Sequence, residues 1–184
     1  MKKSAVVLIA ILFISLFAFT LSKKQGEAKS AIKWLTIQEA EKLSKKNPKK
    51  IMVDVYTSWC GWCKEMDKTT FADPKVAEYV SKNFYAVKFN AETFDSIQFN
   101  NQKFINPGAA TKTRATHQLA MAIGAQNGRI GYPTISYLDE QNKVAAIVPG
   151  YLPADQFLIY LKYINEDAYK TQTPDEYFNN PSNQ

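Results

Sequence analysis

The order of helix-like and strand-like patterns along the chain predicts an α/β sandwich with a central mixed sheet. Two strand patterns flank a helical stretch of about two dozen residues, which is typical of a right-handed parallel crossover. A later pair of strand patterns is separated by a short polar turn, which indicates an antiparallel hairpin. The chain has 184 residues, of which 46% are hydrophobic and 22% charged, and these values suit one globular domain.

An export signal is predicted at residues 1–22. Two lysines precede an apolar run over residues 5–19, and polar residues follow it. The run is shorter than the roughly 20 residues that span a bilayer, which favours cleavage, although retention as a membrane anchor stays open. Residues 23–31 are polar and aperiodic, so we expect them to link the signal to a domain over residues 32–165.

The basic charge argues for a solvated surface. The formal net charge is +6, from 23 basic and 17 acidic residues, and the lysines are scattered along the chain. Proteins that bind nucleic acids usually cluster their charge and rely on arginine, whereas the arginines here are Arg114 and Arg129. We therefore expect no nucleic-acid partner.

The first helix is marked by its cap. Thr36 and Glu39 fit a capping box, and Pro48 ends the helix. Its expected apolar face comprises Ile37, Ala40 and Leu43. The elements expected next are a strand at 51–56 covered on both faces, helices at 60–70 and 74–83, the second capped by Asp73, and a strand at 84–89.

The second half begins with an aperiodic stretch, residues 91–113, which we interpret as a partly ordered inserted loop. A helix is expected from 113 to 123 with Gly124 as its C-cap. The hairpin strands are expected at 134–138 and 143–148. A last helix begins at Pro153, and its apolar face comprises Phe157, Leu158, Leu161 and Ile164. Residues 166–184 are expected to form a loose polar tail.

Cys60 and Cys63 lie three residues apart where a strand turns into a helix. Free N–H groups and the helix dipole at this place lower the pKa of Cys60 and make its thiolate the attacking group, and Cys63 is placed to resolve the mixed disulfide. A structural staple is a weaker alternative, because a closed loop of four residues gives only ~2 kcal/mol. Zinc binding is a still weaker alternative, because the two cysteines and His117 supply fewer than the four ligands of a typical zinc site.

Asp54 lies six residues before Cys60 on an otherwise apolar strand. Burial would raise its pKa, and such an acid can exchange a proton with Cys63. The alternative is an edge position where the carboxylate reaches water. His117 is expected to be a helix-surface or packing residue and not a catalyst.

The stretch from Val53 to Lys64 resembles the active-site strand and helix of the thioredoxin superfamily, including the acid six residues before the first cysteine. Its continuation to Val76 is similar to the C-terminal, periplasmic domain of the bacterial transmembrane thiol:disulfide interchange protein and to small exported relatives. The resemblance covers residues 32–165. It implies a thioredoxin-like three-layer sandwich with an insertion before the cis-proline loop.

The resemblance also implies roles for individual residues. Asp67 matches a second acid that tunes the cysteines, and Lys88 matches the neighbour of the buried acid, although an exposed position at the strand end is equally open. Pro133 matches the cis-proline that faces the cysteines and leaves the backbone of Tyr132 to pair with an extended substrate. The remaining residues expected to bind substrate are Trp59, Gly61 and Trp62, with core packing as the alternative for Trp59.

These inferences predict a thiol:disulfide oxidoreductase of the periplasm or cell envelope, with the reducing direction favoured by the resemblance. Trp62 occupies the position of a proline in thioredoxin, so the direction of electron flow stays open. We expect protein thiols or disulfides as substrates, a membrane electron donor, no metal or other cofactor, and a monomer. The alternative is a redox-inactive binding module or chaperone that recruits an envelope partner through residues 91–113 and the tryptophan rim.

Overall fold

The computed structural model describes residues 32–183. The predicted signal at 1–22 and the linker at 23–31 lie outside the described residues. None of the helices within residues 32–183 combines the length and the apolar character that crossing a bilayer requires. The element order follows the predicted alternation of helices and strands, with additions in the insertion and at the C-terminus.

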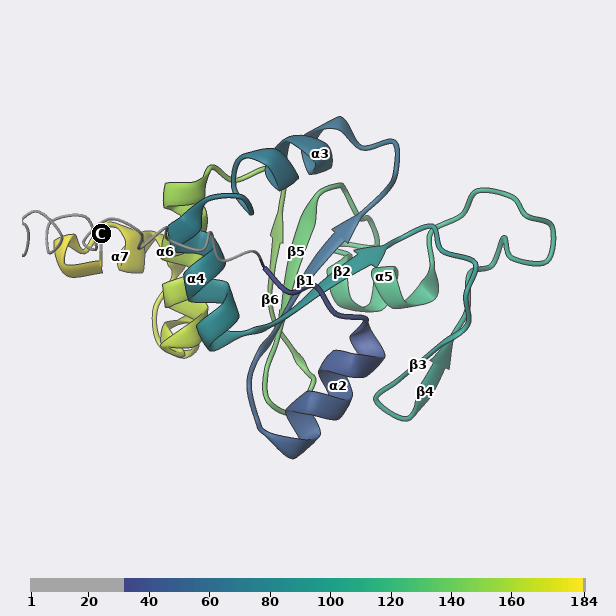
Figure 1. The fold of residues 1–184 in the computed structure, drawn as a ribbon, viewed down its shortest axis with the longest axis horizontal. Coiled ribbons are helices and arrows are strands. Elements are labelled where there is room, and N and C mark those ends of the chain that lie inside the picture. The colour runs from purple at the N-terminus through teal and green to yellow at the C-terminus, as the bar shows by residue number, and fades with distance from the viewer. Residues whose placement is uncertain (1–31, 184) are drawn as a thin grey trace, which may run out of the picture.

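A four-stranded mixed sheet forms the centre of the molecule, in the order β2-β1-β5-β6 (Figure 1). Strand β1 (Ile51–Tyr56) pairs in parallel with β2 (Tyr85–Asn90) and antiparallel with β5 (Thr134–Leu138), which pairs antiparallel with β6 (Val144–Pro149). Strand β1 is therefore central, and residues at its carboxyl end are held by neighbours on both sides. The predicted fold class is confirmed.

Two hydrophobic clusters cover the two faces of the sheet. Helices α4 (Pro74–Asn83) and α6 (Ala154–Asn165) pack on one face together with Met66 of α3 (Gly61–Lys68). Helices α2 (Ile37–Lys46) and α5 (Gln118–Gly124) pack on the other. Because successive residues of a strand face opposite sides, the even-numbered residues Met52 and Asp54 of β1 lie on the face of α3, α4 and α6.

Helix α2 begins with the predicted capping box. The Thr36 side chain accepts from the Glu39 N–H, and the Glu39 carboxylate accepts from the Thr36 N–H. The predicted apolar face is wrong in one member, because Leu43 is exposed. The buried face instead follows the i, i+3, i+4, i+7 spacing that a helix presents to one side, and its members are Ile37, Ala40, Glu41 and Ser44.

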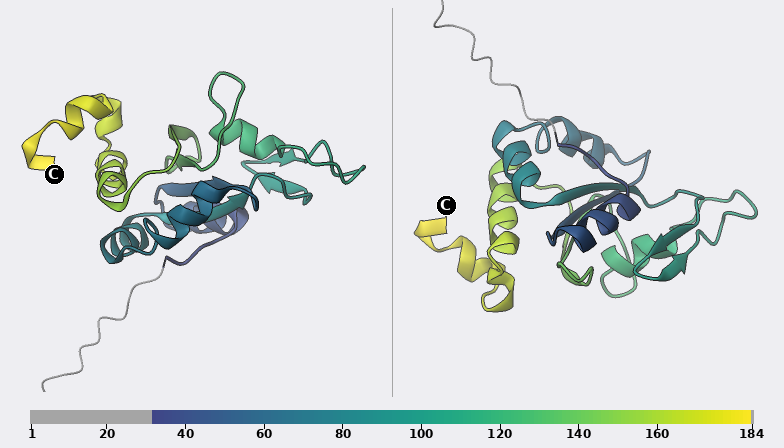
Figure 2. Two further views of the ribbon diagram at one scale, coloured as in Figure 1. Left: turned by 90° about the horizontal axis from the view of Figure 1, so that it is seen from above. Right: turned by 60° about the horizontal axis from the view of Figure 1, so that its bottom comes forward.

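The insertion is more ordered than the sequence indicated. Strands β3 (Ile97–Phe99) and β4 (Gln102–Phe104) form a hairpin whose turn residues, Asn100 and Asn101, have φ of 51° and 62°. Asparagine tolerates this left-handed conformation, which two-residue hairpins favour. The loop after β4 then extends away from the sandwich (Figure 2). The His117 N–H donates to the Ala91 carbonyl at 2.7 Å and closes the base, so we define the insertion as residues 92–116.

Helix α5 starts five residues later than predicted, because His117 is its N-cap. Gly124 is the last helical residue, so its assignment as the C-cap is wrong. A β-carbon at Gly124 would lie 2.8 Å from Ile130 Cδ1, so a larger residue there would have to displace the end of the Ile130 side chain.

The chain after Asn165 is folded, and the expectation of a loose tail is wrong. It forms two 3-10 turns, η1 (Ala168–Lys170) and η2 (Pro181–Asn183), on either side of helix α7 (Pro174–Phe178). Helix α7 has its own capping box at Thr173, and Tyr177 is buried against Tyr163 of α6 with ring centroids 5.2 Å apart. Aromatic burial of this kind was hidden by the polar composition of the segment.

Candidate active site

The two cysteines lie where the chain leaves β1 and enters α3, and they form a disulfide with Cα atoms 5.3 Å apart. Cys60 is the N-cap of α3, and its Sγ accepts a hydrogen bond from the Cys63 N–H at 3.1 Å. The sulfur of Cys60 therefore replaces the side-chain oxygen of an ordinary N-cap. Both residues are shielded, at 4% and 3% exposure, so Cys60 is nearly as covered as Cys63.

This position stabilises negative charge on Cys60 when the disulfide is open. The unpaired N–H groups of the first helical turn and the positive end of the helix dipole act on the same atom. A thiolate is the reactive form of cysteine in exchange, and an environment of this kind lowers the thiol pKa. The geometry thus places the sulfur of Cys60 where negative charge is favoured and the sulfur of Cys63 one helical turn behind it.

Asp54 is buried at 1% exposure on the central strand, which excludes the edge position. Its Oδ2 lies 3.1 Å from Lys88 Nζ, yet neither carboxylate oxygen has an aligned hydrogen-bond donor among the described residues. Burial raises the pKa of Asp54 to about 6, and the charge of Lys88 limits the rise. The carboxyl group can therefore gain or lose a proton close to neutral pH.

Lys88 lies opposite Asp54 on β2 and also pairs with Asp67 of α3. Its Nζ lies between 5.0 and 5.4 Å from the ring centroids of three aromatic residues, Trp34, Tyr56 and Phe71. Burial opposes protonation of Lys88, but the two carboxylates outweigh it and raise its pKa above the ordinary value. The exposed strand-end alternative for Lys88 is therefore wrong.

Asp67 lies on the same helix as Cys63 and pairs with Lys88. It lies four residues after Cys63, so both side chains share one side of α3. Asp54, Lys88 and Asp67 form a continuous series of charges from the buried side of β1 to the partly exposed surface of the helix. The structure thus brings together the three charged residues that the sequence singled out.

Two aromatic pairs flank the disulfide. Trp59 contacts Tyr132 edge to face with centroids 6.0 Å apart, and Trp62 lies 5.4 Å from Tyr151. Trp59 and Trp62 are 51% and 63% exposed, so the core-packing alternative for Trp59 is wrong. Gly61 between them has no atom within 4 Å of an added β-carbon, which leaves open space next to the disulfide.

The Tyr132–Pro133 peptide bond is cis, as the resemblance implied. Within residues 32–183, the backbone N–H and carbonyl of Tyr132 have no hydrogen-bond partner. Strand β5 begins two residues later, at Thr134. A backbone edge that continues a strand and is unpaired can accept an added extended segment.

The base of the insertion contacts the site through residues that the sequence reasoning missed. Glu92 accepts from Trp59 Nε1 at 2.9 Å through one oxygen and from Arg114 Nε at 2.7 Å through the other. The Arg114 guanidinium lies 4.5 Å from the centroid of the Trp59 ring. Nothing in the sequence pairs positions 92 and 114 with 59, although Arg114 is one of two arginines among 23 lysine and arginine residues.

His117 is fully buried and does not reach the cysteines through any contact among the described residues. Its Nδ1 accepts from the Leu119 N–H at 3.1 Å, and its Nε2 lies 3.0 Å from the Asp95 carbonyl. Because Nδ1 accepts, Nε2 carries the proton and donates to Asp95. The prediction of a packing residue is confirmed.

Comparison with known proteins agrees with this geometry. An α/β sandwich with a disulfide at a helix N-terminus and a cis-proline before a strand of the central sheet defines a protein of the thioredoxin fold. A sequence model described as "Thioredoxin-like domain" matches residues 37–165, so the chain belongs to the thioredoxin-like family. This confirms the family resemblance inferred from the sequence.

Curated relatives named as thiol:disulfide interchange proteins match most of this chain. The thiol:disulfide interchange protein DsbD of Vibrio vulnificus (strain CMCP6) is 32% identical over 181 residues, covering 89% of this chain and 26% of that protein. DsbD of Haemophilus influenzae (strain PittEE) is 28% identical over 152 residues, covering 79% and 22%. The chain thus spans about a quarter of the length of these relatives.

Two solved structures share the fold. The solution structure of a thioredoxin from Thermus thermophilus has a TM-score of 0.53 at 19% identity and covers 73% of this chain and 87% of that one. A structure of a DsbH oxidoreductase has a TM-score of 0.52 at 21% identity and covers 82% and 94%.

Proposed function

We propose that this chain is a thiol:disulfide oxidoreductase of the cell envelope that works in the reducing direction on protein disulfides. The observation that carries the proposal is the disulfide at the N-terminus of α3, where Cys60 Sγ accepts from the Cys63 N–H. The relatives named thiol:disulfide interchange proteins support disulfide exchange. The predicted export signal at 1–22 supports the location, and the similarity of residues 53–76 to the C-terminal domain of the interchange protein supports the direction.

In the proposed reaction the Cys60 thiolate attacks a substrate disulfide. A bond forms between Cys60 Sγ and one substrate sulfur, and the other substrate sulfur leaves as a thiolate. The Cys63 thiol then loses its proton and attacks Cys60 Sγ, which forms the Cys60–Cys63 disulfide and releases the second substrate thiolate. Two electrons pass to the substrate, and its two thiolates take up the proton that Cys63 released and a second proton from solvent. An external dithiol, which we propose is part of a membrane electron carrier, reduces the pair again.

Asp54 is proposed as the group that accepts the Cys63 proton. Its pKa of about 6 allows it to be ionised at neutral pH and to take up a proton at small cost. Lys88 and Asp67 are proposed to set that pKa, because Lys88 favours the ionised carboxylate and Asp67 opposes it. Trp59, Trp62, Gly61, Tyr132 and Pro133 are proposed to form the surface that receives the substrate.

Reduction of insulin disulfides, with dithiothreitol as the electron source, tests the proposal. The wild type should accelerate the precipitation of the insulin B chain, and Cys60→Ser should lose this activity. Cys63→Ser should accumulate a mixed disulfide between Cys60 and insulin, visible on a non-reducing gel. Equal, negligible activity in the wild type and in Cys60→Ser would leave the binding module or chaperone as the better interpretation.

A further inference from the structure

The two aromatic pairs beside the disulfide are held very differently. The indole N–H of Trp59 donates to Glu92, its ring is covered by Arg114, and its edge contacts Tyr132. Within the described residues, the indole N–H of Trp62 has no hydrogen-bond partner, and its ring contact is with Tyr151 alone. The Trp59 side of the site is therefore held by three contacts, whereas on the other side the Tyr151 hydroxyl bonds the Thr69 hydroxyl at 3.1 Å and Trp62 itself has only its ring contact with Tyr151 among the described residues.

Residues at both ends of the insertion produce this fixation. Glu92 is the first residue of the insertion, and Arg114 is close to its end. Thr116 lies next to the end as well, and its hydroxyl is 3.4 Å from the Tyr132 hydroxyl. The closing bond from His117 to Ala91 keeps the two ends together, so Glu92 and Arg114 reach Trp59 from one rigid base.

We propose that Arg114 and Glu92 are positioning residues that hold the Trp59 indole against Tyr132, so that the pair forms a preorganised wall for a polypeptide substrate. The inference rests on the proposed function. Each oxygen of the Glu92 carboxylate has its own donor, which fixes the carboxylate as well as the indole. An aromatic side chain that is already ordered loses little freedom when a substrate binds, and this lowers the cost of association.

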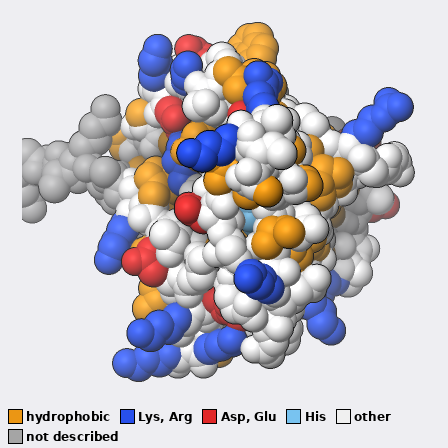
Figure 3. Space-filling model, turned by 90° about the vertical axis from the view of Figure 1, so that its right-hand side faces the viewer, with side chains coloured by type: hydrophobic (Ala, Val, Ile, Leu, Met, Phe, Trp, Pro, Cys, Tyr) orange, Lys and Arg blue, Asp and Glu red, His pale blue; other side chains and the backbone are white. Residues whose placement is uncertain are grey.

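The exposed side chains of the insertion suit a polypeptide substrate better than a small disulfide. Its face exposes hydrophobic side chains among scattered lysine and arginine side chains (Figure 3). Phe94 and Ile105 of the insertion are among the exposed large hydrophobic residues, as is Trp59. A small disulfide needs only the sulfur of Cys60, whereas a folded or extended chain also covers the Trp59–Tyr132 wall.

The test uses pre-reduced protein and measures its oxidation by two probes, insulin and hydroxyethyl disulfide, as a function of probe concentration. Arg114→Ala removes a side chain that is 64% exposed, so the fold should be retained. We expect this variant to raise the half-saturating concentration of insulin about five-fold, the size of ordering one flexible side chain. The limiting rate and the reaction with hydroxyethyl disulfide should not change.

Three further variants define the effect. Arg114→Lys should restore part of the insulin affinity, because it returns a cation to the indole face. Glu92→Gln should keep an acceptor for Trp59 Nε1 but weaken the contact with Arg114, and should give an intermediate half-saturating concentration. Arg129→Ala, which makes the same charge change in the exposed turn closed by Gln126, is the matched control and should behave as the wild type.

An unchanged half-saturating concentration for insulin in Arg114→Ala would overturn the inference. Equal slowing with both probes would also overturn it, because Arg114 would then act on the sulfur and not on the substrate wall. Failure of the proposed function is a separate result, in which the wild-type protein reacts with neither probe.

Discussion

Asp54 is a carboxylate on the central strand, and its burial has a calculable effect on stability. Its pKa in the folded protein is about 6, against 3.8 for the ordinary value. The folded state therefore binds the proton more tightly than the unfolded chain does. This stabilising effect of protonation is complete below pH 3.8 and is lost as the pH rises through about 6.

Asp54→Asn should remove this pH dependence. At pH 8 we expect the variant to be more stable than the wild type by on the order of 2 to 3 kcal/mol, because the buried charge is gone and Lys88 keeps Asp67 as a partner. Below pH 4 the gain should disappear. Urea unfolding of both proteins at several pH values measures this difference in the free energy of unfolding. A difference that stays constant across the pH range would contradict a raised pKa of Asp54 in the folded state.

His117 gives the opposite pH dependence. Burial lowers its pKa, so the neutral ring is favoured in the folded protein. Its contribution is present above the unfolded pKa of about 6.5 and is lost as the pH falls through the lower folded value. Protonation of Nδ1 would also break the cap to the Leu119 N–H.

His117→Asn should keep an acceptor at the N-cap while removing the titrating ring. We expect its stability relative to the wild type to improve as the pH falls from 8 to 5. His117→Ala should lose about 1 kcal/mol relative to the wild type at pH 8, because it has no capping group, and less at pH 5, where protonation costs the wild type its own cap. Urea midpoints of the three proteins at pH 5 and pH 8 give the comparison, and a parallel response of His117→Asn and wild type would argue against a neutral histidine.

At the scale of elements, the insertion is organised by one buried side chain. The Nδ2 of Asn106 donates to the carbonyls of Thr93 and Ala115 at 3.0 and 2.9 Å, and its Oδ1 accepts from the Gly108 N–H at 2.8 Å. These bonds join the start, the middle and the end of the insertion. A loop that satisfies its own backbone in this way can stay ordered outside the main core.

Asn106→Ala should loosen the insertion without unfolding the sandwich. Losing the amide leaves buried backbone groups unpaired, at a cost of about 2 kcal/mol. We expect faster amide exchange and faster proteolysis within residues 92–116, with little change in α2 or β1. Gln102→Ala, at an exposed position of β4, is the control. If amides within residues 92–116 exchange at the same rates in Asn106→Ala and in Gln102→Ala, Asn106 does not organise the insertion.

The elements that local sequence determines were predicted well, and those that depend on distant contacts were not. The capping box of α2, the Asp73 cap of α4 and the continuous apolar pattern of β1, which is buried on both faces, are local signals, and each lies where it was expected. The β3–β4 hairpin has strands of three residues, which is too short for a periodic pattern. Helix α7 depends on packing against α6, which its polar composition does not reveal.

The residues of the candidate site divide in the same way, into those that local sequence indicates and those that depend on distant contacts. Cys60, Cys63 and Asp54 follow from their spacing on one strand and helix, and the resemblance added Lys88, Asp67 and Pro133. Glu92 and Arg114 could not be found, because their contact with Trp59 depends on how the insertion closes at His117.

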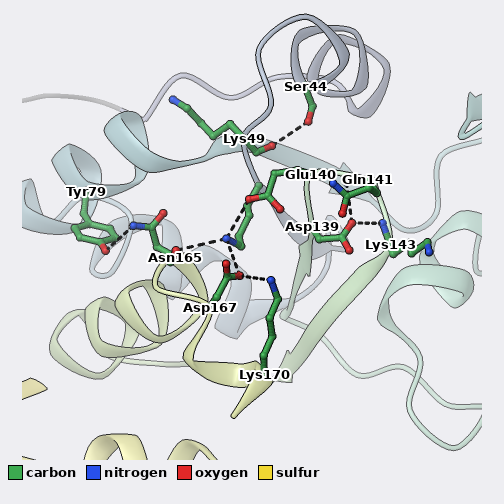
Figure 4. A network of polar contacts seen from close by, with 11 residues as sticks. Ser44, Lys49, Tyr79, Asp139, Glu140, Gln141, Lys143, Asn165, Asp167 and Lys170 are labelled. Atoms are coloured by element: carbon green, nitrogen blue, oxygen red, sulfur yellow. Dashed lines mark hydrogen bonds and ion pairs between the residues drawn. The ribbon is translucent and has the colours of Figure 1, made fainter. Parts of the chain in front are cut away.

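At the scale of the whole molecule, a buried lysine links three segments away from the disulfide. Lys50 Nζ lies 3.1 Å from Glu140 in the β5–β6 turn and 3.0 Å from Asp167 after α6, and it donates to the Asn165 carbonyl. In Figure 4, Glu140, Asn165 and Asp167 surround one amino group. Lys170 also forms an ion pair with Asp167. Burial opposes protonation of Lys50, but the two carboxylates outweigh it and raise its pKa.

Lys50→Ala should destabilise the whole domain, because it leaves Glu140 and Asp167 near one another without their shared cation. We expect a loss of about 2 kcal/mol, less than for a fully buried pair since both carboxylates reach solvent. Lys50→Met, which keeps the apolar stem, should lose less. Global unfolding in urea is the readout, and a loss in Lys50→Met as large as that in Lys50→Ala would show that packing contributes nothing here.

The central claim is that Cys60 and Cys63 exchange electrons reversibly and act as a reductant. The most direct measurement is the fraction of the oxidised pair, counted by alkylation and mass, across thiol–disulfide buffers of known potential. The account predicts one reversible two-electron transition with a midpoint near about −270 mV, as in thioredoxin. A midpoint near about −120 mV would reverse the proposed direction, and a disulfide that persists in strongly reducing buffers, well below about −300 mV, would make it a structural staple.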